Sequence, residues 1–336
     1  MFWYNTLIVK KVVVIGGGTG TYTVLLALRH KPYEITALLT MVDDGGSNKV
    51  LRDDFGLLPT SGVRLAMVAL SSKPSLLREL FLYRYHKGQG ISGMTFGNLF
   101  LAAVADIAGS QEKAIEQTSE ILKVKGKILP ISHEDVRLVA QYENGLEVVG
   151  EHRIDEPEHD GKLKIKKLFT RPEAHITEKA REEIISADAI ILGPGDFYTN
   201  TVANLVVTGV VDALKQSKAQ IIFIMNLMTK YGEAYNYKAS TYFEDLAQYM
   251  PIERINTVLL NNDKKFSPGA LGKYEDEFSI PVDDDLDGKL PGAKIVRAAI
   301  LSRKEAEPQR GDTLKRSMIR HDYKKLRKVL GEIIGE

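Results

Sequence analysis

The chain has 336 residues, 44% of them hydrophobic, which is enough for a full core and, by length alone, for about two domains or one α/β domain with an insertion. Its 45 basic and 44 acidic residues leave a net charge of +1, so no global field favours nucleic acid or an anionic membrane as a partner. The absence of cysteine excludes disulfides, thiolate metal sites and cysteine nucleophiles, and agrees with a cytoplasmic location. We also expect neither a signal peptide nor a membrane span, because the basic residues at the start follow the apolar ones and no stretch reaches about 18 apolar residues.

The first predicted element is a strand at residues 12–15, a short apolar and mostly β-branched run typical of a strand buried on both faces. Four glycines separate it from an apolar helical pattern that begins at Thr23: Gly16, Gly17, Gly18 and Gly20. The N–H groups of such a turn and the positive end of the helix dipole point at one place, which suits a phosphate or pyrophosphate. The dinucleotide fingerprint G-x-G-x-x-G is only partly matched, because Thr21 or Thr23 stands at its last position. The alternative is that the glycines bind no ligand and only allow the strand and the helix to pack closely.

A second strand is predicted at residues 34–42, and an acidic loop follows it. The order strand, helix, strand forms a βαβ unit with parallel strands. The loop consists of Asp43, Asp44, Gly45, Gly46 and Ser47. Its aspartates suit the ribose hydroxyls of a nicotinamide cofactor or a Mg²⁺ ion attached to phosphates. A solvated turn at the end of a strand is the alternative without a ligand.

Two helices are predicted next, at residues 64–70 and 97–109, and Asn98 at the start of the second suits either a helix cap or a ligand contact. Apolar residues then alternate around the pair Asn144-Gly145, a pattern typical of a hairpin. We therefore predict an antiparallel β insertion at residues 128–170. The remaining residues, 1–127 and 171–336, would form a Rossmann-like nucleotide-binding core.

The second half of the chain repeats the pattern of strand, glycine turn and helix. After a helix at 177–185, a strand begins at residue 189 and ends in a turn that contains Gly193 and Gly195. Three further strands, two helices and one polar surface excursion are predicted: strands 219–225, 257–260 and 294–301, helices 240–250 and 322–334, and excursion 264–291. This alternation predicts a three-layer, Rossmann-like α/β fold with a mostly parallel sheet and an antiparallel β insertion.

Ligand sites gather at the carboxyl ends of strands in open α/β sheets, and the loops there define the candidate site. These loops offer N–H donors, hydroxyls and amides but few bases, which suits binding better than proton transfer. We assign no catalytic residue, and the seven histidines show no spacing typical of a zinc site. The candidate binding residues are Gly16, Gly17, Gly18, Thr19, Gly20, Asp43, Asp44, Gly45, Gly46, Ser47, Asn98, Gly193, Gly195, Tyr198, Thr199, Asn226 and Thr229.

Taken together, the loops resemble those of a known family. Nine motifs run in order from about residue 11 to residue 328: KVVVIGGGTGTYTVL, VDDGGS, FGLLP, GNLFLAA, ILPIS, EDVRLVAQYENG, ILGPGDFYTN, NLMTKYGEA and IRHD. The series resembles the YvcK-type gluconeogenesis factors of the CofD-like superfamily. This resemblance implies a cytoplasmic, Rossmann-like protein that binds a UDP-sugar such as UDP-N-acetylglucosamine and supports gluconeogenic growth, cell-wall synthesis and cell shape. By this resemblance, the residues that contact the ligand in that family correspond to Thr19, Asn204 and Arg320.

The enzymatic branch of this superfamily is the second interpretation. It transfers a phospholactyl group from a guanosine diphosphate-linked donor to a deazaflavin precursor, and it shares the first glycine loop but lacks the DDGGS, GPG-x-x-Y-T and RHD set. The chain also departs from its nearer relatives at Gly62-Val63-Arg64-Leu65, Lys230-Tyr231 and Thr21-Tyr22. A different nucleotide is therefore an open alternative.

We expect a regulatory protein that binds a nucleotide-sugar and reports its level to a partner protein, with no required cofactor. A Mg²⁺ ion on the phosphates and a homodimer fit this interpretation, whereas nucleic acid and membrane partners do not. The second hypothesis is a CofD-like phospho-group transferase, and the third is an NAD-dependent oxidoreductase.

Overall fold

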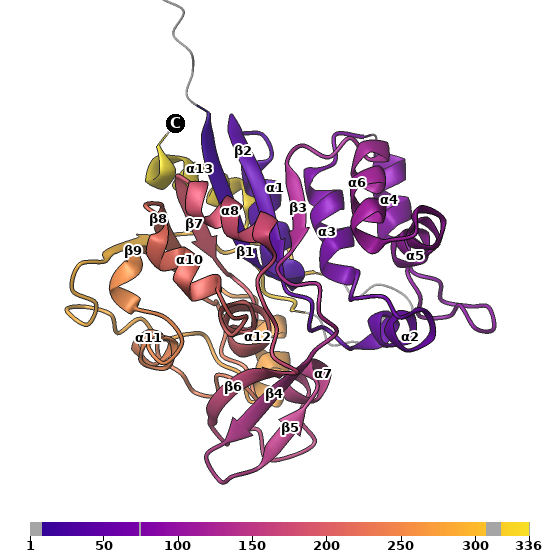
Figure 1. The fold of residues 1–336 in the computed structure, drawn as a ribbon. Helices are drawn as coiled ribbons and strands as arrows, with labels where there is room; N and C mark the ends of the chain where they lie inside the picture. The colour runs from indigo at the N-terminus through magenta and orange to yellow at the C-terminus, as the bar shows by residue number, and fades with distance from the viewer. Residues whose placement is uncertain (1–8, 74, 307–316, 336) are drawn as a thin grey trace, which may run out of the picture.

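The main sheet orders the whole molecule. The computed structural model describes residues 9–73, 75–306 and 317–335, and within them seven strands form one sheet in the order β10-β9-β8-β7-β1-β2-β3 (Figure 1). In that order the strands are β10 (Lys294–Ala298), β9 (Ile255–Asn261), β8 (Gln220–Ile224), β7 (Ala189–Leu192), β1 (Lys10–Gly16), β2 (Tyr33–Leu39) and β3 (Lys127–Pro130). Every pair of neighbours in this sheet is parallel.

Helices cover both faces of this sheet, because its strands are apolar on both sides. Val13 and Ile15 of β1 face one core cluster, whereas Val12 and Val14 face another. The first cluster includes residues of α8 (Glu178–Ser186), α10 (Val210–Gln216) and α11 (Ala239–Leu246). The second includes residues of α1 (Gly18–Leu28), α3 (Ser61–Leu70), α4 (Ser75–Leu82), α5 (Phe96–Ala108), α6 (Gln111–Ile121) and α13 (Tyr323–Ile334). The predicted three-layer α/β fold is confirmed.

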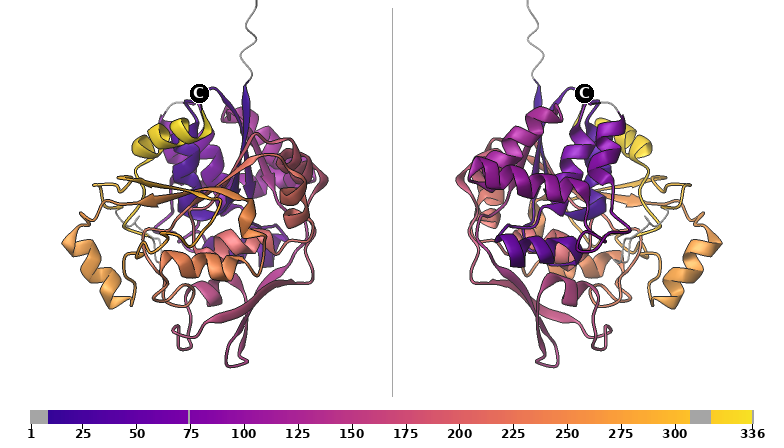
Figure 2. Two further views of the ribbon diagram at one scale, coloured as in Figure 1. Left: turned by 90° about the vertical axis from the view of Figure 1, so that its left-hand side faces the viewer. Right: turned by 90° about the vertical axis from the view of Figure 1, so that its right-hand side faces the viewer.

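The insertion forms a second, antiparallel sheet in the order β5-β4-β6, made of β5 (Glu147–Val149), β4 (Arg137–Tyr142) and β6 (Ile165–Arg171). Leu138 and Tyr142 of β4 lie in the same core cluster as Val13 of the main sheet. The start of the predicted segment 128–170 differs from the structure, because Lys127–Pro130 pairs with β2 as an edge strand of the parallel sheet. Figure 2 shows the small sheet at the bottom of the molecule, beyond the carboxyl ends of the main strands.

Most predicted helices and strands are present, but the helices α4, α6 and α10 were not predicted from the sequence. The acidic loop after β2 runs directly into α2 (Gly46–Phe55), which the sequence analysis did not predict. The excursion at 264–291 contains α12 (Pro268–Asp276), whose N-cap Ser267 accepts a hydrogen bond from the Ala270 N–H. The remaining short elements are α7 (Glu151–Asp155), a π-helix at Phe197–Val202, α9 (Ala203–Leu205) and a 3₁₀ turn at Ile252–Arg254.

The strand order changes direction between β1 and β7, which are parallel neighbours in the sheet. From β1 the strand order runs outward through β2 to β3, and from β7 it runs the other way to β10. The loops after these two strands therefore diverge and leave a crevice at their carboxyl ends, which is where open α/β sheets bind ligands. The loops also touch, because a Cβ atom on Gly20 would lie 2.0 Å from the carbonyl oxygen of Pro194.

The last helix, α13, packs against the first helix, α1, on one face of the main sheet. Leu326 and Leu330 of α13 belong to the same core cluster as Val24 of α1. The Arg327 Nε donates to the Ala27 carbonyl at 3.2 Å, and the Lys10 Nζ of β1 donates to the Gly335 carbonyl at 3.1 Å. The early and late parts of the chain thus form one unit.

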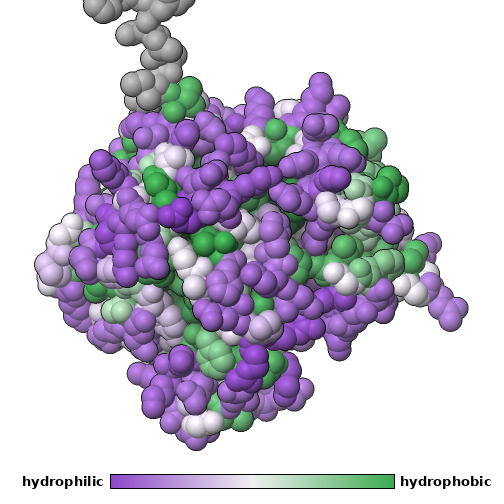
Figure 3. Space-filling model, in the orientation of Figure 1, coloured by the Kyte–Doolittle hydropathy of each residue, from purple (hydrophilic) through white to green (hydrophobic). Residues whose placement is uncertain are grey.

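The surface is mostly hydrophilic, with apolar residues gathered on the right of Figure 3 over α4 and α5. Leu76 of α4 and Ile107 of α5 are among the most exposed large apolar residues, at 74% and 83%. Within the described residues, no helix combines the length and the apolar character needed to cross a membrane.

Candidate functional site

A cavity of about 810 Å³ opens over the carboxyl ends of β1, β2, β7 and β8. Its walls come mainly from the loops after these four strands, from α3, from α7 of the insertion, from residues 274–279 and from residues 317–321, which precede α13. The cavity therefore lies beside β1 and β7, where the strand order changes direction. Among the predicted residues, those that line it are Gly17, Gly18, Thr19, Gly20, Asp43, Gly45, Ser47, Gly195, Thr199, Asn226, Thr229 and Arg320.

The N-terminus of α1 forms one end of this cavity. The helix begins at Gly18, and its N-cap Gly17 has no side chain to satisfy the first N–H groups. Gly18 has a φ of +61°, a conformation that favours glycine. An added Cβ on Gly17 would lie 2.4 Å from Oδ1 of Asn200, so the Asn200 side chain would have to move. Unsatisfied N–H groups at a helix N-terminus form a site for a phosphate.

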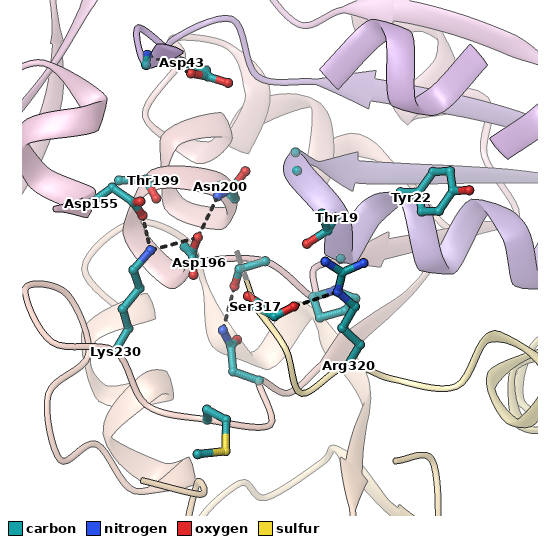
Figure 4. Close-up of a pocket in the computed structure, with 18 of the residues that line it drawn as sticks. Thr19, Tyr22, Asp43, Asp155, Asp196, Thr199, Asn200, Lys230, Ser317 and Arg320 are labelled. Atoms are coloured by element: carbon teal, nitrogen blue, oxygen red, sulfur yellow. Dashed lines mark hydrogen bonds and ion pairs between the residues drawn. The ribbon is translucent and has the colours of Figure 1, made fainter. Parts of the chain in front are cut away.

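Arg320 lies at the same end of the cavity. Figure 4 shows its guanidinium beside Thr19 of α1, although the two residues are far apart in the sequence. The Arg320 Nε donates to the Ser317 carbonyl at 2.8 Å, which fixes the orientation of the side chain. A guanidinium and a helix N-terminus thus face the same space.

The two aspartates after β2 have different environments. Asp43 lines the cavity, and its Oδ1 accepts a hydrogen bond from the Gly45 N–H at 3.0 Å. Asp44 does not line the cavity, because its Oδ1 accepts the His152 N–H at 2.9 Å and so caps the first turn of α7. The acidic loop therefore attaches the insertion to the main sheet.

Asn98 lies behind the cavity wall and is fully buried. Its Nδ2 donates to Ser47 Oγ at 2.9 Å, and its Oδ1 accepts from Arg64 Nε at 2.9 Å. Ser47 and Arg64 both line the cavity. Asn98 thus supports two wall residues and does not itself face the cavity.

Several other predicted residues also lie outside the cavity wall: Gly16, Gly46, Gly193, Tyr198 and Asn204. The hydroxyl of Tyr198 donates to Asp245 at 2.8 Å within the core. The Nδ2 of Asn204 donates to the Asn200 carbonyl at 2.6 Å, so it supports the turn that carries Asn200. Asn200 itself lines the cavity, although the resemblance pointed to Asn204. The amide of Asn200 ends the sequence GPGDFYTN and could have been recognised there.

The remaining predicted residues on the wall make contacts within the loops. The Asn226 Nδ2 donates to the Gly195 carbonyl at 2.7 Å, which ties the loop after β8 to the loop after β7. Thr199 Oγ1 donates to Glu233 at 2.8 Å, and Thr229 Oγ1 accepts the Ile280 N–H at 2.9 Å. These bonds hold the loops in place around the cavity.

Comparison with known proteins identifies the family of the chain. Residues 12–301 match the family model described as 2-phospho-L-lactate transferase CofD. The chain belongs to the CofD family.

Its relatives in this family include gluconeogenesis factors. The chain is 35% identical to the gluconeogenesis factor of Bacillus subtilis over 328 residues, which are 97% of this chain and 98% of the relative. It is 38% identical to the one of Halalkalibacterium halodurans over 274 residues, which are 81% and 84% of the two chains. The crystal structure of a UPF0052-family protein from Bacillus halodurans superposes with a TM-score of 0.86 at 33% identity and covers 96% of this chain and 98% of its own. The resemblance to the gluconeogenesis factors is confirmed.

The sequence analysis missed one charged cluster in the cavity of this CofD-family protein. Asp155 of α7, Asp196 after β7 and Glu233 after β8 place their oxygens within 4.8 Å of one another, around the ammonium of Lys230. Burial raises the pKa of Glu233 to about 8 and also raises the pKa of Asp196. Although burial opposes it, the Lys230 ammonium holds the pKa of Asp155 below its usual value. The pKa values of these three carboxyl groups around one ammonium are therefore shifted in different directions.

His321, the neighbour of Arg320, is buried and neutral in the folded protein. Its side chain is 8% exposed, and its Nε2 has no hydrogen-bond partner among the described residues. Burial lowers the pKa of His321 to about 4, although a contact with the Met225 backbone opposes the change. The unfolded chain thus binds a proton at a higher pH than the folded one, so stability falls as the pH drops from about 6.5 towards 4.

We predict that His321→Gln removes this part of the acid sensitivity. Between about pH 7.5 and pH 4.5 the unfolding free energy of the variant should fall by about 2 to 3 kcal/mol less than that of the wild type. Urea unfolding at the two pH values measures the difference. His175→Gln, at an exposed histidine, is the control and should follow the wild type. Equal losses in all three proteins would contradict the prediction.

Proposed function

We propose that this CofD-family protein binds a nucleoside diphosphate-sugar, with UDP-N-acetylglucosamine as the first candidate, and acts as a regulator. The observation that carries the proposal is the meeting of the α1 N-terminus and Arg320 at one end of the cavity. Helix N–H groups and a guanidinium fork both suit a pyrophosphate. The cavity of about 810 Å³ lies in the range of about 300 to 1,000 Å³ typical of small-molecule sites.

The rest of the cavity supplies groups that suit the ribose and the sugar. Hydroxyls of Thr40 and Ser61 and the amide of Asn226 line it, and all of these can bond to hydroxyl groups. Asp43 would be the residue to hold a Mg²⁺ ion against the phosphates, because Mg²⁺ is commonly bound by one or two carboxylates and water.

A binding role agrees with the state of the acidic groups. Asp155 and Asp196 are paired with Lys230, so these two carboxylates are held in ion pairs. The names of the relatives also favour a factor over an enzyme. A phospho-group transferase that uses the same loops is the second candidate, because the matching family model is described as a transferase.

As a regulator in the cytoplasm, the protein would respond to the level of a nucleotide-sugar and pass that information to a partner protein. Such a signal would link sugar-nucleotide supply to gluconeogenic growth, cell-wall synthesis and cell shape. A homodimer is compatible with this role.

We predict that UDP-N-acetylglucosamine raises the melting temperature of the purified protein, whereas NAD and NADH do not. A ligand at about 100 times its dissociation constant stabilises by about 2.7 kcal/mol if it binds only the folded state. Thermal unfolding with UDP-N-acetylglucosamine, GDP, NAD and NADH, followed by analysis for products, measures both binding and turnover. A shift without products supports the regulator, and a shift with products supports the transferase. A larger shift with NADH than with any UDP compound would contradict the proposal.

A further inference from the structure

Lys230 joins three separate segments at the wall of the cavity. Its ammonium contacts Asp155 at the end of α7, lies 3.1 Å from Oδ2 of Asp196 and lies 4.0 Å from Oε1 of Glu233 (Figure 4). These carboxylates come from the insertion, from the loop after β7 and from the loop after β8. The single ammonium therefore holds together parts of the chain that no secondary structure connects.

The members of the cluster differ in exposure. The Glu233 side chain is fully buried, and its carboxylate also accepts the Tyr198 N–H at 2.7 Å and the Thr199 hydroxyl at 2.8 Å. The side chains of Asp155 and Asp196 are 19% and 34% exposed, and both residues line the cavity. Glu233 thus anchors the cluster, while Asp155 and Asp196 present it to a ligand.

Without Lys230 these carboxylates would repel one another. Like charges a few ångströms apart in a poorly solvated site favour protonation or separation. Their oxygens would also suit a divalent cation, but the ammonium already fills the centre. Lys230 therefore does the work of a bound metal ion in keeping the acidic side chains close together.

The cavity has a cationic end and an acidic end. Figure 4 shows Thr19 and Arg320 on one side and the cluster around Lys230 on the other, with Asn200 between them. The carboxylates repel phosphates but accept hydrogen bonds from hydroxyl groups. A ligand with a pyrophosphate and a hydroxyl-rich sugar would therefore place its sugar at the acidic end.

We propose that Lys230 is a built-in cation that positions Asp155 and Asp196 to bind the hydroxyl groups of the ligand's sugar. This inference rests on the proposed function and adds the orientation of the ligand and a residue that determines its sugar specificity. UDP lacks the sugar, so its affinity should depend little on Lys230. The affinity for a UDP-sugar should depend strongly on Lys230.

The test compares the affinities of Lys230→Met for UDP-N-acetylglucosamine and for UDP by calorimetry. We expect the wild type to bind the UDP-sugar about tenfold more tightly than UDP, which is the gain in affinity that about two hydrogen bonds would give. The variant should lose this preference while its affinity for UDP stays within about threefold. Lys238→Met is the matched control, because Lys238 is paired with Asp283 on the surface, outside the cavity, and should behave as the wild type.

Two further measurements separate positioning from a general structural role. Millimolar Mg²⁺ should restore part of the sugar preference in Lys230→Met but leave the preference of the wild type unchanged, because the ion can then replace the ammonium among the carboxylates. If Lys230→Met does not fold, Asp155→Asn keeps the ammonium and should by itself reduce the preference for the UDP-sugar. A folded Lys230→Met or Asp155→Asn protein with an unchanged preference would overturn the inference alone. A wild type that binds neither UDP nor UDP-N-acetylglucosamine would overturn the proposed function and the inference with it.

Discussion

Arg320→Ala should bind UDP-N-acetylglucosamine about ten to a hundred times more weakly than the wild type, while the ligand-free variant melts close to it. A charge-assisted contact to phosphate is worth roughly 1.5 to 3 kcal/mol, which corresponds to this change in affinity. Arg320 lies beside Thr19 at the α1 N-terminus, and its bond to the Ser317 carbonyl is a local contact within one loop. Its loss should therefore affect the ligand more than the fold. Calorimetry measures the affinity, and thermal unfolding measures the stability.

Two further variants make this result specific. Arg320→Lys should recover only part of the affinity, because one point charge cannot reproduce the fork of the guanidinium. Arg181→Ala, which removes a surface arginine paired with Glu178 of α8, should change neither quantity by much. Unchanged affinity in a folded Arg320→Ala protein would remove Arg320 from the ligand site and weaken the residue assignments carried over from the resemblance.

Gly20→Ala should lower the unfolding free energy by about 3 kcal/mol, near the upper end of what overpacking usually costs. An added Cβ would lie 2.0 Å from the oxygen and 2.6 Å from the carbon of the Pro194 carbonyl. Both atoms belong to the backbone of the loop after β7, so no rotation of a side chain can relieve the contact. One of the two loops that form the crevice would have to move. Urea unfolding measures the loss.

Gly272→Ala in α12 is the matched control, because nothing lies within 4 Å of the added atom. Alanine is a better helix former than glycine, so this variant should be equal to the wild type or more stable by up to about 1 kcal/mol. If the two alanine variants changed stability alike, close approach between the β1 and β7 loops would not be the reason for glycine at position 20.

The sequence predicted the main elements because each buried parallel strand is a compact apolar run. The strands at 12–15 and 189 onward and the helix from 322 were recognisable in this way, and the glycine turns marked where the strands end. The helix α2 was missed because GSNKVLRDDF contains four charged residues and only one apolar residue that becomes buried, Leu51. The pairing of β1 with β7 could not be derived from the sequence, because it joins residues far apart in the chain.

The sequence indicated which loops surround the cavity but not which way each polar side chain points. The loops after β1, β2, β7 and β8 do surround one cavity, as the carboxyl-end rule implies. Polar residues in the helices that follow such loops can point to either side, and Asn98 and Asn204 point into the protein. Asp155 had no signal in the sequence, because it enters the cavity from an insertion whose docking depends on the cap that Asp44 provides for α7.

The packing of α13 on α1 has a consequence for biosynthesis. The glycine turn is translated early, yet β1 obtains its second neighbour only after about residue 192 has emerged. The helix α1 packs on α3, but its contact with α13 forms only once residues 323–334 have emerged. Arg320 arrives at the cavity just before that helix. A nascent chain therefore carries an open sheet edge and an apolar helix that is only partly covered for most of its translation, a state that exposes it to aggregation and to chaperones. Nascent and truncated chains that lack residue 320 would therefore bind the ligand more weakly than finished molecules and would compete poorly with them for it.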